Sequence, residues 1–96
     1  MITLTDQQLQ LLQEYAAALM HVTEIAILLD IPPEDRTAFE VICINDRNSP
    51  LYQAFHTGRL QTKLELRRNI IKLAKAGSPA AEPIALKFIN EQLIDK

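Results

Sequence analysis

The sequence has no tryptophan, one cysteine and only two glycines among its 96 residues. So little glycine argues against a fold of many short strands and tight turns, whereas the abundance of leucine, alanine and glutamine favours helices. The single cysteine, Cys43, excludes an intrachain disulfide and fits a reducing compartment. No uncharged run approaches the roughly 20 residues of a membrane-spanning helix, and no secretory signal is visible, so we expect a cytoplasmic protein without a membrane partner.

Residue patterns for catalysis or metal binding are also missing. The two histidines and the one cysteine do not follow the spacing of metal ligands, and no Gly-rich phosphate loop or nucleophile motif occurs. The length suits one small domain, and 48% apolar residues is too many for a disordered chain. We therefore expect a small all-α protein with no enzyme activity, no cofactor and no metal site, which acts by binding.

Start signals predict three helices in the first half of the chain. Thr5 is followed three residues later by a glutamine, a capping box that opens a helix over residues 6–20. Thr23 is expected to cap a short second helix. Pro33 suits the first position of a third helix, which we place over residues 33–45.

The second and third of these helices have the pattern of a helix-turn-helix motif. Ala26 is small where the two helices would cross, and Asp30 lies in the turn, since aspartate tolerates left-handed backbone better than most residues. A turn of three or four residues sets a crossing angle that lets the next helix stand away from the body. An ordinary helical hairpin uses the same residues, so both interpretations stay open.

A long helix is expected in the second half. Ser49-Pro50 is a helix cap followed by a first-turn proline, and the helix can continue to Ala76 unless Gly58 kinks it. Gly77 then supplies the usual C-terminal stop.

A final helix completes the expected fold. Ser78-Pro79 repeats the cap-and-proline signal, and the helix runs to about residue 94. We predict a three-helix bundle with a helix-turn-helix over residues 1–48, followed by a helical hairpin of the long helix and the final helix over residues 49–96. The two parts are expected to pack as one domain, and the hairpin is expected to serve self-association.

The long helix carries two apolar stripes, whereas a surface helix needs only one. The first stripe contains Leu51, Phe55, Leu66, Ile70 and Leu73, and the second contains Leu60, Leu64 and Ile71. The second stripe is covered either by deeper burial within the monomer or by a partner chain. Because 96 residues offer limited core around such a long helix, we favour a homo-oligomer with Leu60, Leu64 and Ile71 as its candidate interface.

Charge is distributed unevenly along the chain. Residues 1–46 carry eight acidic side chains against Arg36 alone, a net charge of −7, whereas residues 47–96 carry nine Lys or Arg against four acidic side chains, a net charge of +5. Such asymmetry fits a nucleic-acid or acidic partner for the basic half. It also fits docking of one half on the other or on a neighbouring copy, or simply a solvated helix face.

Three segments resemble phage small-terminase-like proteins with a helix-turn-helix. These are Thr23–Ile31 as the first helix and turn of the motif, Ser49–Arg59 as the aromatic and basic opening of the long helix, and Leu73–Ala81 as the next turn. The resemblance extends from about residue 5 to residue 93. It implies a non-enzymatic, oligomeric DNA-binding protein of phage or mobile-element origin, with a large packaging ATPase subunit as a possible partner.

Duplex DNA is bound largely through its phosphates, so exposed cations are the candidate contacts. The candidate DNA-binding residues are Arg36 and Thr37 in the third helix, together with Arg47, Arg59, Lys63, Arg67, Arg68, Lys72 and Lys75. The chain departs from the family pattern at Asp30, where such motifs often have glycine, and in the acidic residues Glu34, Asp35 and Glu40. The alternative is therefore a protein-interaction or oligomerisation module whose degenerate helix-turn-helix does not bind DNA.

Overall fold

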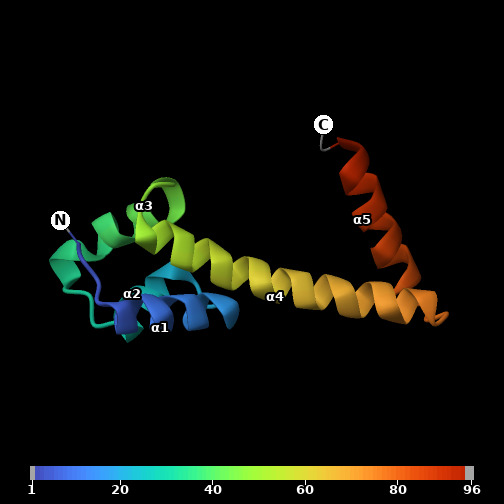
Figure 1. Cartoon of the computed structure of the whole chain (residues 1–96), viewed down its shortest axis with the longest axis horizontal. Helices are drawn as coiled ribbons and strands as arrows, with labels where there is room; N and C mark the ends of the chain where they lie inside the picture. Colours follow the sequence, from blue (N-terminus) through green and yellow to red (C-terminus); the bar gives the residue numbers. More distant parts are fainter. Residues whose placement is uncertain (1, 95–96) are drawn as a thin grey trace. The chain divides into compact units, whose positions relative to one another are not determined.

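Helices make up all of the regular secondary structure in residues 2–94, the part of the chain that the computed structural model describes (Figure 1). The five α-helices are α1 (Asp6–Ala17), α2 (Val22–Leu28), α3 (Arg36–Asn45), α4 (Pro50–Lys75) and α5 (Glu82–Ile94), and a single 3-10 turn, η1 (Pro33–Asp35), precedes α3. The prediction of an all-α protein with five helices is thus confirmed.

The chain divides into two compact units, which we call the N-terminal unit (residues 1–62) and the C-terminal unit (residues 63–96). The division falls inside α4, and not between residues 48 and 49 where the sequence suggested it. The reason is that the first turns of α4 supply Leu51 and Phe55 to the core of the N-terminal unit, where both are buried.

A single apolar core holds the N-terminal unit together. Its largest fully buried side chains are Phe39 from α3 and Phe55 from α4, which fill the space between the shorter helices. The remaining core residues come from all four helices and the turns between them: Leu12, Ala16, Val22, Ile25, Ala26, Leu29, Ile31, Cys43 and Leu51. Because α2 and α3 both contribute to this core, the turn between them is held at a fixed geometry.

Three helices end in the same backbone arrangement. After α1, α2 and α4, one residue takes left-handed backbone, with φ of 62° at Leu19, 56° at Asp30 and 90° at Gly77. The next N–H then donates to the carbonyl five residues back, which satisfies a free carbonyl at the helix end. The expected stops at Asp30 and Gly77 are confirmed. The first helix ends three residues before the predicted residue 20, because the left-handed turn at Leu19 stops it.

The helix starts match the predictions less completely. The capping box at Thr5 is present, but Thr23 does not cap α2. His21 does so instead: its Nδ1 accepts from the Thr23 N–H at 3.3 Å, and the Glu24 carboxylate accepts from the His21 N–H at 2.9 Å. The third α-helix begins at Arg36 and not at residue 33, because the three residues before it form η1. A 3-10 turn of this kind is common at helix N-termini.

Gly58 does not kink α4, which is continuous. It lies where α4 crosses α1, and a Cβ atom there would clash with the carbonyl oxygen of Gln13 and lie 2.9 Å from the Cβ of Ala16. Glycine is therefore required by the close approach of the two helices and not by its backbone conformation.

Polar side chains of α4 also cap the C-terminal end of α1. The Thr62 hydroxyl donates to the carbonyl of Ala17, and the Arg59 guanidinium donates to the carbonyl of Met20 at 3.3 Å. The same guanidinium lies 4.3 Å above the ring of Phe55. The first contact satisfies a carbonyl that the end of α1 leaves unpaired, and the second one in the segment after it, so together they hold α4 against α1 at the crossing.

Substitution of Gly58 tests this crossing. We expect Gly58→Ala to lower the free energy of unfolding by about 2 kcal/mol, because overpacking a close helix contact forces the backbones apart. The control is Thr57→Ala, which shortens an exposed side chain one position away and should change stability by less than about 0.5 kcal/mol. Urea denaturation followed by circular dichroism measures both. Equal stability of the two variants would show that the crossing is looser than the structure indicates.

Candidate functional site

The outward face of α3 is uncharged. Its exposed residues are Thr37, Ala38, Val41, Ile44 and Asn45. Val41 and Ile44 are the large apolar members, with 52% and 48% of their surface exposed. In a DNA-binding helix-turn-helix, this is the face that would meet base edges. The number of charges along the sequence does not reveal this face, because it does not separate the outward side of the helix from its margins.

The acidic residues of this region lie beside that face. Glu34 is exposed in η1, and Glu40 is half-buried at the margin of α3. The one cation predicted to offset them, Arg36, is half-buried, and its Nε donates to the carbonyl of Ile31 at 3.1 Å. Arg36 therefore closes the turn between α2 and α3. Of the two residues predicted to read a DNA groove, only Thr37 lies on the outward face.

The remaining two candidate DNA contacts of the N-terminal unit differ in their surroundings. Arg47 is exposed in the loop after α3. Arg59 is half-buried, with its guanidinium engaged by the Met20 carbonyl and the Phe55 ring. Arg59 thus stabilises the crossing of α4 and α1.

Most of the predicted basic residues of the C-terminal unit are exposed. Lys63, Arg68, Lys72 and Lys75 all lie on the exposed surface of α4. Arg67 is different: its guanidinium lies 4.2 Å above the ring of Phe88 and 2.7 Å from the Glu91 carboxylate. Arg67 therefore joins α4 to α5, and the other four cations are the ones presented to solvent.

The C-terminal unit has almost no core of its own. Among residues 63–92, whose side chains the structure describes, the one fully buried apolar residue is Ala81. Seven large apolar side chains of the unit are between 40% and 56% exposed: Leu64, Leu66, Ile71, Leu73, Ile84, Leu86 and Ile89. Two of them, Leu64 and Ile71, belong to the predicted oligomer interface. The third predicted member, Leu60 in the N-terminal unit, is 60% exposed.

A groove separates the two helices of the C-terminal unit. The end of α4 and α5 diverge from the turn at Gly77 (Figure 1), and the groove between them has a volume of about 330 Å³. It is lined by Ile71, Ala74, Lys75, Ala85, Phe88, Ile89 and Gln92. We call it the hairpin groove. Its walls are mainly apolar, and its one charged lining residue is a cation.

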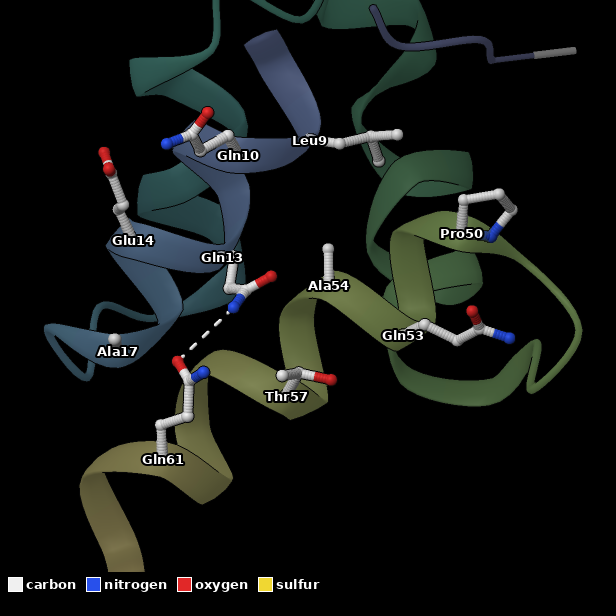
Figure 2. Close-up of a pocket in the computed structure, with 10 residues that line it drawn as sticks. All are labelled: Leu9, Gln10, Gln13, Glu14, Ala17, Pro50, Gln53, Ala54, Thr57 and Gln61. Carbon is white, nitrogen blue, oxygen red and sulfur yellow. Dashed lines mark hydrogen bonds between the residues drawn. The ribbon is translucent and has the colours of Figure 1, made fainter. Parts of the chain in front are cut away.

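A second groove, of about 570 Å³, lies between α1 and α4 in the N-terminal unit (Figure 2). Four glutamines from the two helices line it, and Gln13 donates to Gln61 at 3.3 Å across one end. Figure 2 shows that the other polar side chains point outward in different directions. Glu14 is the one charged lining residue, so the groove is unsuited to an anion.

Cys43 and His56 are covered by the fold, whereas the second histidine, His21, is exposed and caps α2. Cys43 is fully buried, and burial together with the nearby Glu40 charge raises the pKa of its thiol to about 12. His56 packs against the rings of Tyr52 and Phe55, and its Nε2 atom is buried without a hydrogen-bond partner. In residues 2–94 no three His, Cys, Asp or Glu side chains are grouped as metal ligands. The surfaces described above are therefore the candidate sites.

Compared with known family models, curated proteins and solved structures, the chain has no match in any of the three. The resemblance to small terminase subunits therefore stays a prediction. No helix within the described residues has the length and apolar character needed to cross a membrane.

The pair formed by Arg67 and Glu91 can be tested by titration. The hydrogen bond from Arg67 lowers the pKa of the Glu91 carboxyl below its ordinary value of 4.5, partly offset by desolvation and supported by the charges of Arg67 and Lys63. Because the pKa is lowered, the pair stabilises the unit above a pH of about 4.5 and this stabilisation is lost as pH falls through the lowered pKa. We expect Arg67→Gln to return the pKa toward 4.5, as measured by NMR of the side-chain carboxyl carbon. Arg68→Gln, which removes the same charge one position away, is the control and should leave most of the shift in place.

Proposed function

We propose that the chain is a non-enzymatic assembly protein that self-associates through its C-terminal unit. The observation that supports this function lies in residues 63–92 of that unit, where seven leucines and isoleucines are exposed and Ala81 is the single buried apolar residue. A partner surface that covered them would bury apolar area that the monomer leaves in water.

The energetics of the C-terminal unit favour such a partner. It consists of the last thirteen residues of the continuous α4, residues 63–75, and of α5, which is 13 residues long. A separate helix of the length of α5 is marginal in water without tertiary packing. The side-chain contacts of Arg67 with Phe88 and Glu91 join the two segments, but an exposed ion pair contributes little to stability because water and salt screen it. Full burial of one leucine or isoleucine contributes about 1.5–3 kcal/mol, so burial by a partner would outweigh these contacts.

The N-terminal unit supports a role in protein interaction more than a role in groove reading. It carries eight acidic and three basic residues. Two of those three cations, Arg36 and Arg59, bind backbone carbonyls of their own unit. A net charge of −5 opposes the approach of DNA phosphates, whereas it does not oppose a basic protein surface.

Self-association is tested by the dependence of mass on concentration. We expect the wild-type chain to sediment as a multiple of 10.9 kDa, and Leu64→Glu with Ile71→Glu to raise its dissociation constant by at least about 100-fold. Gln7→Glu with Gln10→Glu is the matched control, because it adds the same two charges at exposed positions of α1. A wild-type chain that stays monomeric at millimolar concentration overturns the proposal.

DNA binding by the assembled protein is the second candidate function. The observation that favours it is the set of four exposed cations on α4, at positions 63, 68, 72 and 75, for which no ion pair is found among the described residues. In an oligomer every copy presents the same four cations, so the number of phosphate contacts and the affinity for DNA rise with the number of copies. The resemblance to small terminase subunits adds a packaging ATPase as the expected partner for this function, together with a phage or mobile-element origin.

Salt dependence separates this candidate from self-association alone. We expect binding to a DNA duplex at about 50 mM salt, weakening steeply toward 200 mM, with each phosphate contact adding about 0.9 to the slope of log K against log salt. Arg68→Gln with Lys72→Gln should reduce that slope by about 2 in a fluorescence anisotropy titration. Lys87→Gln, which removes an exposed cation of α5, is the control for net charge. Absence of binding at 50 mM salt removes this candidate, because phosphate contacts are strongest there.

A further inference from the structure

We infer that copies of this chain assemble head to tail, with the outward face of α3 from one copy seated in the hairpin groove of the next. This inference deepens the proposed self-association and rests on it. It identifies the surface of the neighbouring copy that the C-terminal unit binds. The exposed apolar side chains of the hairpin do not identify that surface by themselves.

The hairpin groove has the lining that an apolar helix face needs. Ile71 and Ala74 from α4 face Phe88 and Ile89 from α5, so apolar side chains form both walls. Lys75 lines the same groove. Positions three and four apart are neighbours on a helix, so Arg68 and Lys72 lie beside Ile71 and Lys75 on the surface of α4. The groove is therefore apolar within and cationic along its α4 edge.

The outward face of α3 has the complementary properties. Val41 and Ile44, three positions apart, are each about half exposed and stand next to the small side chain of Ala38. Spacing of this kind is the usual way in which a helix lays an apolar face into a groove. The charged residues that flank the face are mostly carboxylates, Glu34, Asp35, Glu40 and Asp46, against Arg47 and Arg36, whose Nε is bound to the Ile31 carbonyl. An apolar centre with an acidic margin would thus meet an apolar groove with a basic edge.

Charge also decides between this arrangement and a symmetric one. If two hairpins paired with each other about a two-fold axis, both of the joined units would carry more basic than acidic residues. Like charges facing each other cost free energy and suppress such pairing. The head-to-tail arrangement instead joins a unit with net charge −5 to a unit with seven basic and four acidic residues, a net charge of +3.

A head-to-tail contact has a consequence for the size of the assembly. Each copy offers one α3 face and one hairpin groove, so every bound copy leaves another surface free. Contacts of this kind continue until a ring closes, or extend as a filament where it does not.

Two single-surface variants test the inference by complementation. Val41→Lys places a cation on the α3 face, so this face should no longer bind the basic groove of another copy. The hairpin groove of the same variant stays intact. Ile71→Glu places an anion in the hairpin groove, so this groove should no longer bind the α3 face of another copy with its acidic margin. The α3 face of the same variant stays intact. We expect each variant alone to be monomeric, and an equimolar mixture to form pairs with a dissociation constant within about threefold of that of the wild-type contact, as measured by sedimentation velocity.

The outcomes distinguish the inference from the function on which it rests. If Val41→Lys assembles by itself as the wild type does, and does not rescue Ile71→Glu, the hairpins pair with each other: the head-to-tail contact is then wrong and the proposed function stands. If the wild type is monomeric, both fail. Ile44→Lys and Ile89→Glu repeat the test at second positions of the same two surfaces, and circular dichroism confirms that each variant is folded. Gln7→Lys on α1 is the control for an added cation away from α3.

Discussion

The crossing of α4 over α1 at Gly58 is the contact on which the N-terminal unit depends. Close approach at one glycine lets Thr62 and Arg59 reach the carbonyls at the end of α1, and it places Leu51 and Phe55 in the core. A helix that begins by packing into one unit then continues for thirteen residues into another. The first part of α4 therefore packs into an apolar core, whereas residues 63–75 belong to a unit with almost no core.

The uneven distribution of apolar burial is the structural basis of the proposed function. The N-terminal unit has a core of eleven buried apolar residues around Phe39 and Phe55, whereas among residues 63–92 of the C-terminal unit Ala81 alone is buried. Hydrophobic burial is the main favourable contribution to folding and to association, so surface left exposed in one chain is available for binding another. The same reasoning applies to α3, where Val41 and Ile44 remain half exposed although the helix is firmly held by its buried face.

Two helices joined by a short turn, as α2 and α3 are, do not by themselves imply DNA binding. The turn at Asp30 and the buried face of α3 are what the fold requires, and they are compatible with any chemistry on the outward face. In this chain that face is uncharged and has acidic neighbours, while the cation closest to it, Arg36, is bound to the Ile31 carbonyl. The side chains on the exposed face are therefore the ones that support the protein partner proposed here.

The sequence by itself determined the helices and most of their ends, including the capping box at Thr5 and the stop at Gly77, because capping depends on hydrogen bonds within a few residues. It also showed two apolar stripes on α4 by their period. Only the tertiary structure decided that the first stripe is buried at Leu51 and Phe55 but exposed at Leu66 and Leu73, and that Arg36 and Arg59 bind carbonyls. Burial and such long-range contacts depend on which other segment packs against a residue, and no local pattern in the chain encodes that.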